Sequence, residues 1–462
     1  MGIGNHSLKE KASKRSSLLV KNVIASFVIK GWSAIIVLLM VPLTLNILGI
    51  YNNGVWLTLS SILIWIDLMD IGLGNGLRNA VANYVAEGND QKVREAVSST
   101  FFMLAVIVIP FLLLAYVFIH FVDLYGLLGI DPEQTCNLGT ILMIAISIAS
   151  GTFVLKIVGN FYMGLQLPAV NNLILCLGHT LALLFTFLLY LAGSHSLLMV
   201  VVINTAAPFV TWAITIPYTF IKRYPQYCPS VKHIHLNLAR NLFTTGMKFF
   251  VIQICGVVLF MTTNIIISKF FSPAEVTPYQ VAYRYFNIAF VLFSTICMPF
   301  WNATTDAYAR KEFEWIYKVG QRLNMLIAGI FIMLLVMLLV SGFVYHIWVG
   351  SEVSIPFSLS AFTALYVFIL CMSQRYSYIL NGINELRIQL ICIIPATIIF
   401  LPLAWYVSKT FGTVSSLVCV MCLVNIPGLI ANAWKYYQIF PRNKKNDTDY
   451  VRKRYSHTHG HL

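Results

Sequence analysis

The chain is a succession of long apolar runs separated by short polar segments. About twelve runs reach the roughly 20 residues that an α-helix needs to cross the hydrocarbon core of a bilayer. They are too long for the amphipathic pattern of soluble helices. The predicted spans cover residues 20–47, 54–73, 98–120, 138–160, 171–192, 198–220, 246–270, 278–303, 323–347, 357–380, 389–408 and 413–433. The pattern therefore predicts an all-α polytopic membrane protein.

The order of spans and polar segments repeats once. Each half begins with a long span, a short outer turn and a second span, which a hydrophilic segment follows on the inside. An even number of spans per half gives the two halves the same orientation, so we expect two six-helix lobes. The predicted parts are a cytoplasmic N-terminal segment (1–19), an N-lobe (20–220), a basic cytoplasmic inter-lobe loop (221–241), a C-lobe (242–434) and a basic cytoplasmic tail (435–462).

Composition and charge agree with a membrane protein. The chain is 58% hydrophobic and only 10% charged, with a mean hydropathy of +0.78, whereas soluble proteins carry roughly 25% charged residues. Its net charge of +14 would also suit nucleic acid. Lys and Arg are concentrated in the predicted inner segments, however, as the positive-inside rule requires. We therefore expect both termini in the cytoplasm and no nucleic-acid partner.

The sequence contains no pattern of a known catalytic or metal site. It lacks a phosphate-binding loop, HExxH and GxSxG. The largest predicted outer loop, 121–137, has no Arg, Lys or His. Most of the nine cysteines lie in apolar runs, where they are typical small buried side chains. We expect no enzyme activity, no cofactor and no metal.

Charged side chains inside apolar spans are the main candidates for function, because they are costly there. Lys30 lies about ten residues into the first span, roughly 15 Å along the helix axis, although its long stem could also reach the interface. Arg284 lies among tyrosines in the eighth span, which favours the wall of a polar cavity. Further candidates for a substrate cavity are Tyr283, Tyr285, Asn287, Gln253 and Asn264. The alternative for such polar groups is simple hydrogen bonding between helices.

A charged, glycine-rich stretch, residues 67–78, ends the second span on the inside. If the helix continues through it, Asp67 and Arg78 share one face with Gly74, and Asp70 lies beside them. Each of the three glycines lowers helix propensity by roughly 1 kcal/mol relative to Ala. The combination predicts either a flexible inner gate or coupling site formed by the two carboxylates and the arginine, or a static packing seam with an Asp–Arg pair.

Within this stretch, the run from Asp70 to Asn79 (Asp-Ile-Gly-Leu-Gly-Asn-Gly-Leu-Arg-Asn) resembles the end of the second span in Wzx-type O-antigen flippases. These form part of the polysaccharide transporter branch of the multidrug/oligosaccharidyl-lipid/polysaccharide (MOP) exporters. The resemblance implies two lobes around a central cavity, lined mainly by the first, second, seventh and eighth spans. It also implies the bacterial cytoplasmic (inner) membrane as the location.

The resemblance further implies a function. It is export of an undecaprenyl-pyrophosphate-linked oligosaccharide, an O-antigen (lipopolysaccharide) or capsule repeat unit, from the inner to the outer leaflet by alternating access. Expected partners are this lipid-linked oligosaccharide, membrane lipids and other polysaccharide assembly proteins. One alternative is a lipid II or drug exporter of the same superfamily, although cationic drugs would favour acidic cavity residues. Another is a membrane-embedded polysaccharide polymerase, which would require a large functional outer loop.

Overall fold

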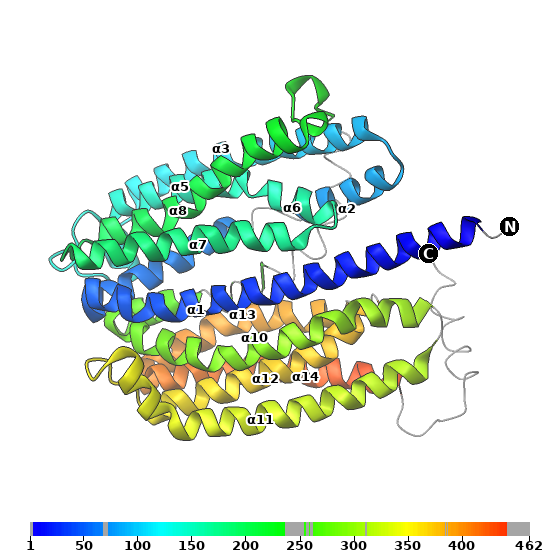
Figure 1. Cartoon of the computed structure of the whole chain (residues 1–462). Helices are drawn as coiled ribbons and strands as arrows, with labels where there is room; N and C mark the ends of the chain where they lie inside the picture. The colour runs from blue at the N-terminus through cyan, green and yellow to red at the C-terminus, as the bar shows by residue number, and fades with distance from the viewer. Residues whose placement is uncertain are drawn as a thin grey trace. The chain divides into compact units, whose positions relative to one another are not determined.

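The computed structural model describes residues 3–67, 73–235, 254–255, 258, 262–309, 312–383, 385 and 387–440, with some helical positions (3–27 among them) described by their backbone alone. All regular elements in these ranges are helices (Figure 1). Nine helices of the described chain are long and apolar enough to cross a membrane. The predicted all-α polytopic class is therefore confirmed.

The long helices follow the predicted apolar runs, and short helices also form in the predicted polar segments between them. They are α1 (Ile3–Asp67), α2 (Leu73–Ala86), α3 (Asp90–Phe121), α4 (Leu124–Leu128), α5 (Leu138–Leu155), α6 (Ile157–Gly164), α7 (Pro168–Leu191), α8 (Leu197–Pro217), η2 (Tyr218–Arg223), η3 (Pro225–Tyr227), η4 (Val231–His233), α10 (Pro273–Ala309), α11 (Phe313–Val349), α12 (Phe357–Gly382), α13 (Arg387–Phe411) and α14 (Val414–Ile439). The first two predicted spans meet inside α1 at Gly49, whose φ of 68° and ψ of 175° interrupt the helix. Glycine adopts this backbone conformation without a steric penalty. Only parts of the predicted span 246–270 are among the described residues.

The described residues divide into two compact units. Residues up to 255 together with 262–277 form unit 1, and residue 258 together with the described residues from 278 to 440 forms unit 2. Residues 236–253, where the chain passes out of the predicted inter-lobe loop, lie outside the described residues. The lobe limits drawn from the sequence therefore stay a prediction.

In unit 1, residues 262–277 are joined to the second half of α1 by hydrogen bonds between buried groups. The Thr277 hydroxyl donates to the carbonyl of Ile50 at 2.9 Å, and the Asn264 amide donates to the Ser61 hydroxyl at 2.6 Å. Buried polar groups without partners are costly, so each pair restricts how this segment can dock. Close backbone packing accompanies these bonds at Gly54, where a methyl group would overlap the carbonyl oxygen of Pro273.

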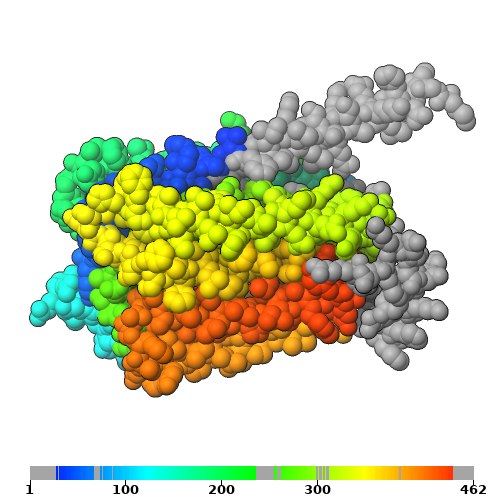
Figure 2. Space-filling view, turned by 90° about the horizontal axis from the view of Figure 1, so that it is seen from below, coloured from blue at the N-terminus to red at the C-terminus, as the bar shows by residue number. Residues whose placement is uncertain are grey.

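Unit 2 contains α10 to α14. Within it, α12 packs against α11 and α14, and α13 packs against α14. Figure 2 shows these helices side by side, from the yellow of α11 to the red of α14. The Thr413 hydroxyl accepts a hydrogen bond from the backbone N–H of Ser416 and so caps the start of α14.

Replacing Gly54 with alanine tests the close packing in unit 1. We expect Gly54→Ala to destabilise the protein by about 3 kcal/mol, because the added methyl group can be accommodated only if the backbone at Pro273 moves. The apparent Tm of the purified full chain in detergent measures the effect. The matched control is Gly31→Ala, whose added methyl group meets no atom within 4 Å and which should stabilise α1 by up to about 1 kcal/mol. Equal Tm values for the two variants would contradict the packing described.

Candidate substrate-contact residues

Three of the predicted cavity residues share the less buried side of α10 in unit 2. Tyr283, Arg284 and Asn287 are all half-buried, and their spacing of one, three and four positions places them on one side of the helix. Arg284 makes no hydrogen bond or ion pair with other described residues. A permanently charged guanidinium with free donors in an apolar span is suited to binding an anion.

Tyr285, the remaining predicted cavity residue on α10, lies on the opposite side of this helix, inside unit 2. It is 7% exposed, its hydroxyl donates to the carbonyl of Met337 at 3.0 Å, and its ring meets Tyr345 edge-on at 5.4 Å. Tyr345 in turn lies 3.2 Å from the Ser360 hydroxyl. The hydroxyl of Tyr285 is thus occupied within the protein, and its ring holds α10 against α11.

The other predicted cavity residues are placed differently. Asn264 belongs to unit 1, is 3% exposed, and uses its amide to reach Ser61. This arrangement corresponds to the alternative of hydrogen bonding between helices. Gln253 lies outside the described residues, and so does the side chain of Lys30, although the backbone of Lys30 is part of α1. Their roles as cavity residues stay predictions.

The charged, glycine-rich stretch is described only at its two ends. Asp70 and the side chain of Asp67 lie outside the described residues, while Arg78 is exposed on α2. Helix α2 is amphipathic: Leu73 and Leu77 are fully buried, and it packs against α3 and α6. The gate or coupling role of Asp67, Asp70 and Arg78 therefore stays a prediction.

A second arginine, Arg375 on α12, is enclosed rather than available. It is 2% exposed, its Nη2 donates to the Gly320 carbonyl at 3.2 Å, and its guanidinium lies over the rings of Tyr376 (4.3 Å) and Tyr436 (5.4 Å). Gly320 lets Tyr436 come close to α11, because a methyl group at this position would overlap the Tyr436 hydroxyl. Cation–π contacts are strong when desolvated. Arg375 therefore fastens α11, α12 and α14 together and is not accessible to a substrate.

Arg375 was not among the candidate residues drawn from the sequence. It lies near the inner end of the predicted span 357–380, where an arginine normally extends to the interface. The feature of the sequence that could have indicated its contacts with aromatic rings is the tyrosine-rich run Arg-Tyr-Ser-Tyr at 375–378. A similar tyrosine-rich pattern surrounds Arg284, so the pattern alone did not distinguish an enclosed arginine from one that lies on the less buried side of its helix.

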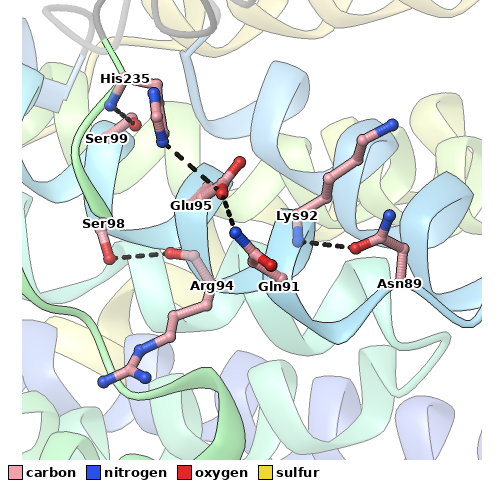
Figure 3. A network of polar contacts seen from close by, with 8 residues as sticks. All are labelled: Asn89, Gln91, Lys92, Arg94, Glu95, Ser98, Ser99 and His235. Atoms are coloured by element: carbon pink, nitrogen blue, oxygen red, sulfur yellow. Dashed lines mark hydrogen bonds and ion pairs between the residues drawn. The ribbon is translucent and has the colours of Figure 1, made fainter. Parts of the chain in front are cut away.

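A polar network on α3 was also missed by sequence reasoning (Figure 3). Arg94 Nε donates to the carbonyl of Cys228 at 2.8 Å, the Ser98 hydroxyl accepts from the N–H of Ser230 at 3.0 Å, and the Ser99 hydroxyl accepts from the N–H of His235 at 2.8 Å. These side chains satisfy backbone groups that have no helix or strand partner. The network thus holds residues 225–235, here named the docked linker, along the first turns of α3.

Further contacts secure both ends of the docked linker. The Tyr227 hydroxyl donates to the Asp90 carboxylate at 2.8 Å. Burial and the nearby Asp90 carboxylate raise the pKa of Tyr227, because both disfavour the phenolate and favour the neutral hydroxyl that donates to Asp90. His235 lies 3.6 Å from Glu95 and forms an ion pair when its imidazole is protonated. The docked linker is therefore fixed to α3 as far as His235.

Comparison with known proteins identifies the class. A family model described as "Polysaccharide biosynthesis protein" matches residues 19–300, and the chain belongs to this family. This match confirms, at the level of the family, the resemblance drawn from the run at Asp70–Asn79.

Two relatives have names that mention O-antigen. The chain is 23% identical over 390 residues to the "Putative O-antigen transporter" of Salmonella typhi, covering 82% of this chain and 87% of the relative. It is 21% identical over 406 residues to the "Putative O-antigen export protein" of Yersinia pseudotuberculosis, covering 85% and 89%. Both relatives are named for transport or export.

Solved structures show the same fold. An inward-facing MATE-family multidrug resistance transporter of the MOP superfamily matches with a TM-score of 0.72 at 14% identity, covering 88% of this chain and 96% of that one. An outward-facing MATE-family transporter matches with a TM-score of 0.62 at 13% identity, covering 90% and 95%. At such low identity these matches establish the fold and not the substrate.

Removing the arginine of the network should release the docked linker. Arg94→Ala deletes a charge-assisted hydrogen bond worth about 1.5 kcal/mol, so local opening should rise roughly tenfold. Limited chymotrypsin digestion of the full chain, with cleavage mapped after Tyr227, measures this opening. Lys232→Ala is the control, because the exposed Lys232 side chain forms no hydrogen bond in the described chain. Unchanged cleavage in Arg94→Ala would contradict the proposed anchoring.

Proposed function

We propose that this protein is a flippase that moves an undecaprenyl-pyrophosphate-linked oligosaccharide from the inner to the outer leaflet of the bacterial cytoplasmic membrane. The observation that carries the proposal is Arg284, a half-buried cation without a described protein partner in an otherwise uncharged span. Membership in the polysaccharide biosynthesis family and relatives named for O-antigen transport support the same conclusion. The oligosaccharide is an O-antigen or capsule repeat unit.

The chemistry of the substrate suits the residues of α10. A pyrophosphate is anionic and accepts hydrogen bonds, and a guanidinium donates several in a planar arrangement. Tyr283 and Asn287, on the same side as Arg284, can contact sugar hydroxyls or the first sugar ring. Lys30 of α1 is a second proposed cation. Alternating exposure of these groups to the two sides of the membrane would complete the transport cycle.

The membrane potential offers one source of energy. Moving one charge through 100 mV is worth about 2.3 kcal/mol, so two negative charges leaving an inside-negative cell would gain about twice that. Proton coupling through Asp67 or Asp70 is the other source we propose. Neither requires a nucleotide, a metal or catalysis by this chain.

The MATE-like fold raises multidrug export as a second candidate. A transporter of cationic drugs needs anionic side chains where the drug binds. Between residues 276 and 305, α10 contains no Asp or Glu, and its intramembrane charge is that of Arg284. The charge of α10 therefore favours an anionic substrate.

Substitution of Arg284 tests the proposed function. In a strain lacking the chromosomal gene, Arg284→Ala should reduce surface glycan by about ten- to a hundredfold, because a hydrogen-bonded charge contributes about 1.5–3 kcal/mol. Arg284→Lys should restore part of it, since the charge remains but the planar donor set is lost. Surface glycan is quantified on cells with matched amounts of membrane-inserted protein.

The matched control is Val291→Ala, which removes an exposed apolar side chain from the same helix and should leave surface glycan unchanged. Wild-type glycan from a well-expressed Arg284→Ala protein would remove this arginine from the mechanism. Wild-type glycan in the strain lacking the gene altogether would contradict the flippase assignment itself.

A further inference from the structure

Helix α7 of unit 1 is covered on two sides by its neighbours. On one side, Thr180 accepts a hydrogen bond from the Trp32 indole of α1 at 3.2 Å. On the other, Gly178 lies against Pro208 and Thr211 of α8. Helical geometry leaves two strips of α7 between these contacts, one on each flank.

One of the two strips consists of leucine. Leu173, Leu177, Leu184, Leu188 and Leu191 follow the helical spacing, and each is between 45% and 64% exposed. An unbroken strip of exposed leucines along a membrane-spanning helix is suited to hydrocarbon chains. We name this strip the leucine side.

The other strip carries polar groups. It runs through Asn172, Leu175, His179, Leu183, Thr186 and Tyr190, of which Thr186 is buried, and we name it the polar side. His179 lies halfway along α7, is exposed, and forms no hydrogen bond with the described residues. Tyr190 is 45% exposed at the end of the helix. An ionisable side chain near the bilayer centre is costly against lipid, so the polar side is better suited than the leucine side to a polar space.

We propose that the polar side of α7 binds uncharged sugar residues of the transported oligosaccharide. The inference rests on the proposed flippase function and names a sugar-contacting surface for it. Imidazole and amide groups both donate and accept hydrogen bonds, as sugar hydroxyls require, and a tyrosine adds an aromatic surface. Helix α7 contains no Lys, Arg, Asp or Glu. Its polar groups therefore suit the neutral sugars rather than the pyrophosphate.

Two lipid probes separate sugar binding from lipid binding. One is undecaprenyl pyrophosphate without sugar, and the other is an undecaprenyl-pyrophosphate-linked oligosaccharide extracted from the producing cells. For the full chain in nanodiscs, His179→Ala should weaken binding of the glycosylated probe at least fivefold and change binding of the bare lipid by less than twofold. His179→Gln should retain binding of the glycosylated probe to within twofold, because an amide replaces both hydrogen-bonding functions of the imidazole. Leu177→Ala, on the leucine side, is the matched control.

Each outcome decides the assignment. Equal affinity of wild type and His179→Ala for the glycosylated probe overturns it. An equal loss in His179→Gln and His179→Ala also overturns it, because protonation of the imidazole would then be the required property. If His179→Ala does not fold, Tyr190→Leu takes its place with the same expected selectivity for the glycosylated probe. A wild-type chain that binds neither probe contradicts the proposed function itself, whereas failure of this inference leaves wild-type binding intact.

Discussion

The constraint on which the structure depends is that a polar group in the membrane must find a partner or a polar space. Helices satisfy the backbone, so the remaining question concerns side chains. In unit 1, Asn264 and Thr277 meet this requirement by bonding to the second half of α1. These bonds attach residues 262–277 to unit 1, although the repeat in the sequence assigns that span to the second half. The hydrogen bonds thus indicate which unit this segment packs into, and hydropathy gives no information on that point.

Three arginines satisfy this requirement in different ways. Arg375 is enclosed by tyrosine rings and a carbonyl, so its charge contributes to the packing of unit 2. Arg94 lies at the end of a span and holds the docked linker through a backbone carbonyl. Arg284 has neither kind of partner in the described structure. Two of the cations are explained by the fold, and the third requires a ligand or a polar space to explain its position.

The sequence predicted well where each helix lies along the chain, and less well which side of a helix is covered by its neighbours. Apolar length predicted the spans, and the helical ranges agree with them closely. Hydropathy cannot say which neighbour covers which side, because that depends on packing between segments distant in the chain. It therefore grouped Tyr285 with Tyr283 and Arg284, although Tyr285 packs inside unit 2, and it overlooked the polar side of α7. Arg94 and its serines were likewise hidden, since their partners are backbone groups that have no sequence signature.

Under the proposed function, the side of α10 that carries Arg284 and the polar side of α7 are suited to different parts of a lipid-linked glycan. The surface on α10 carries a fixed positive charge, suited to the pyrophosphate that all such substrates share. The surface on α7 carries neutral donors and acceptors, suited to sugars that differ from one repeat unit to another. Hydrogen bonds to specific hydroxyls discriminate strongly, because an incorrect sugar leaves polar groups unpaired. Affinity for the class of substrate and selectivity for one glycan can then reside on separate helices and change independently.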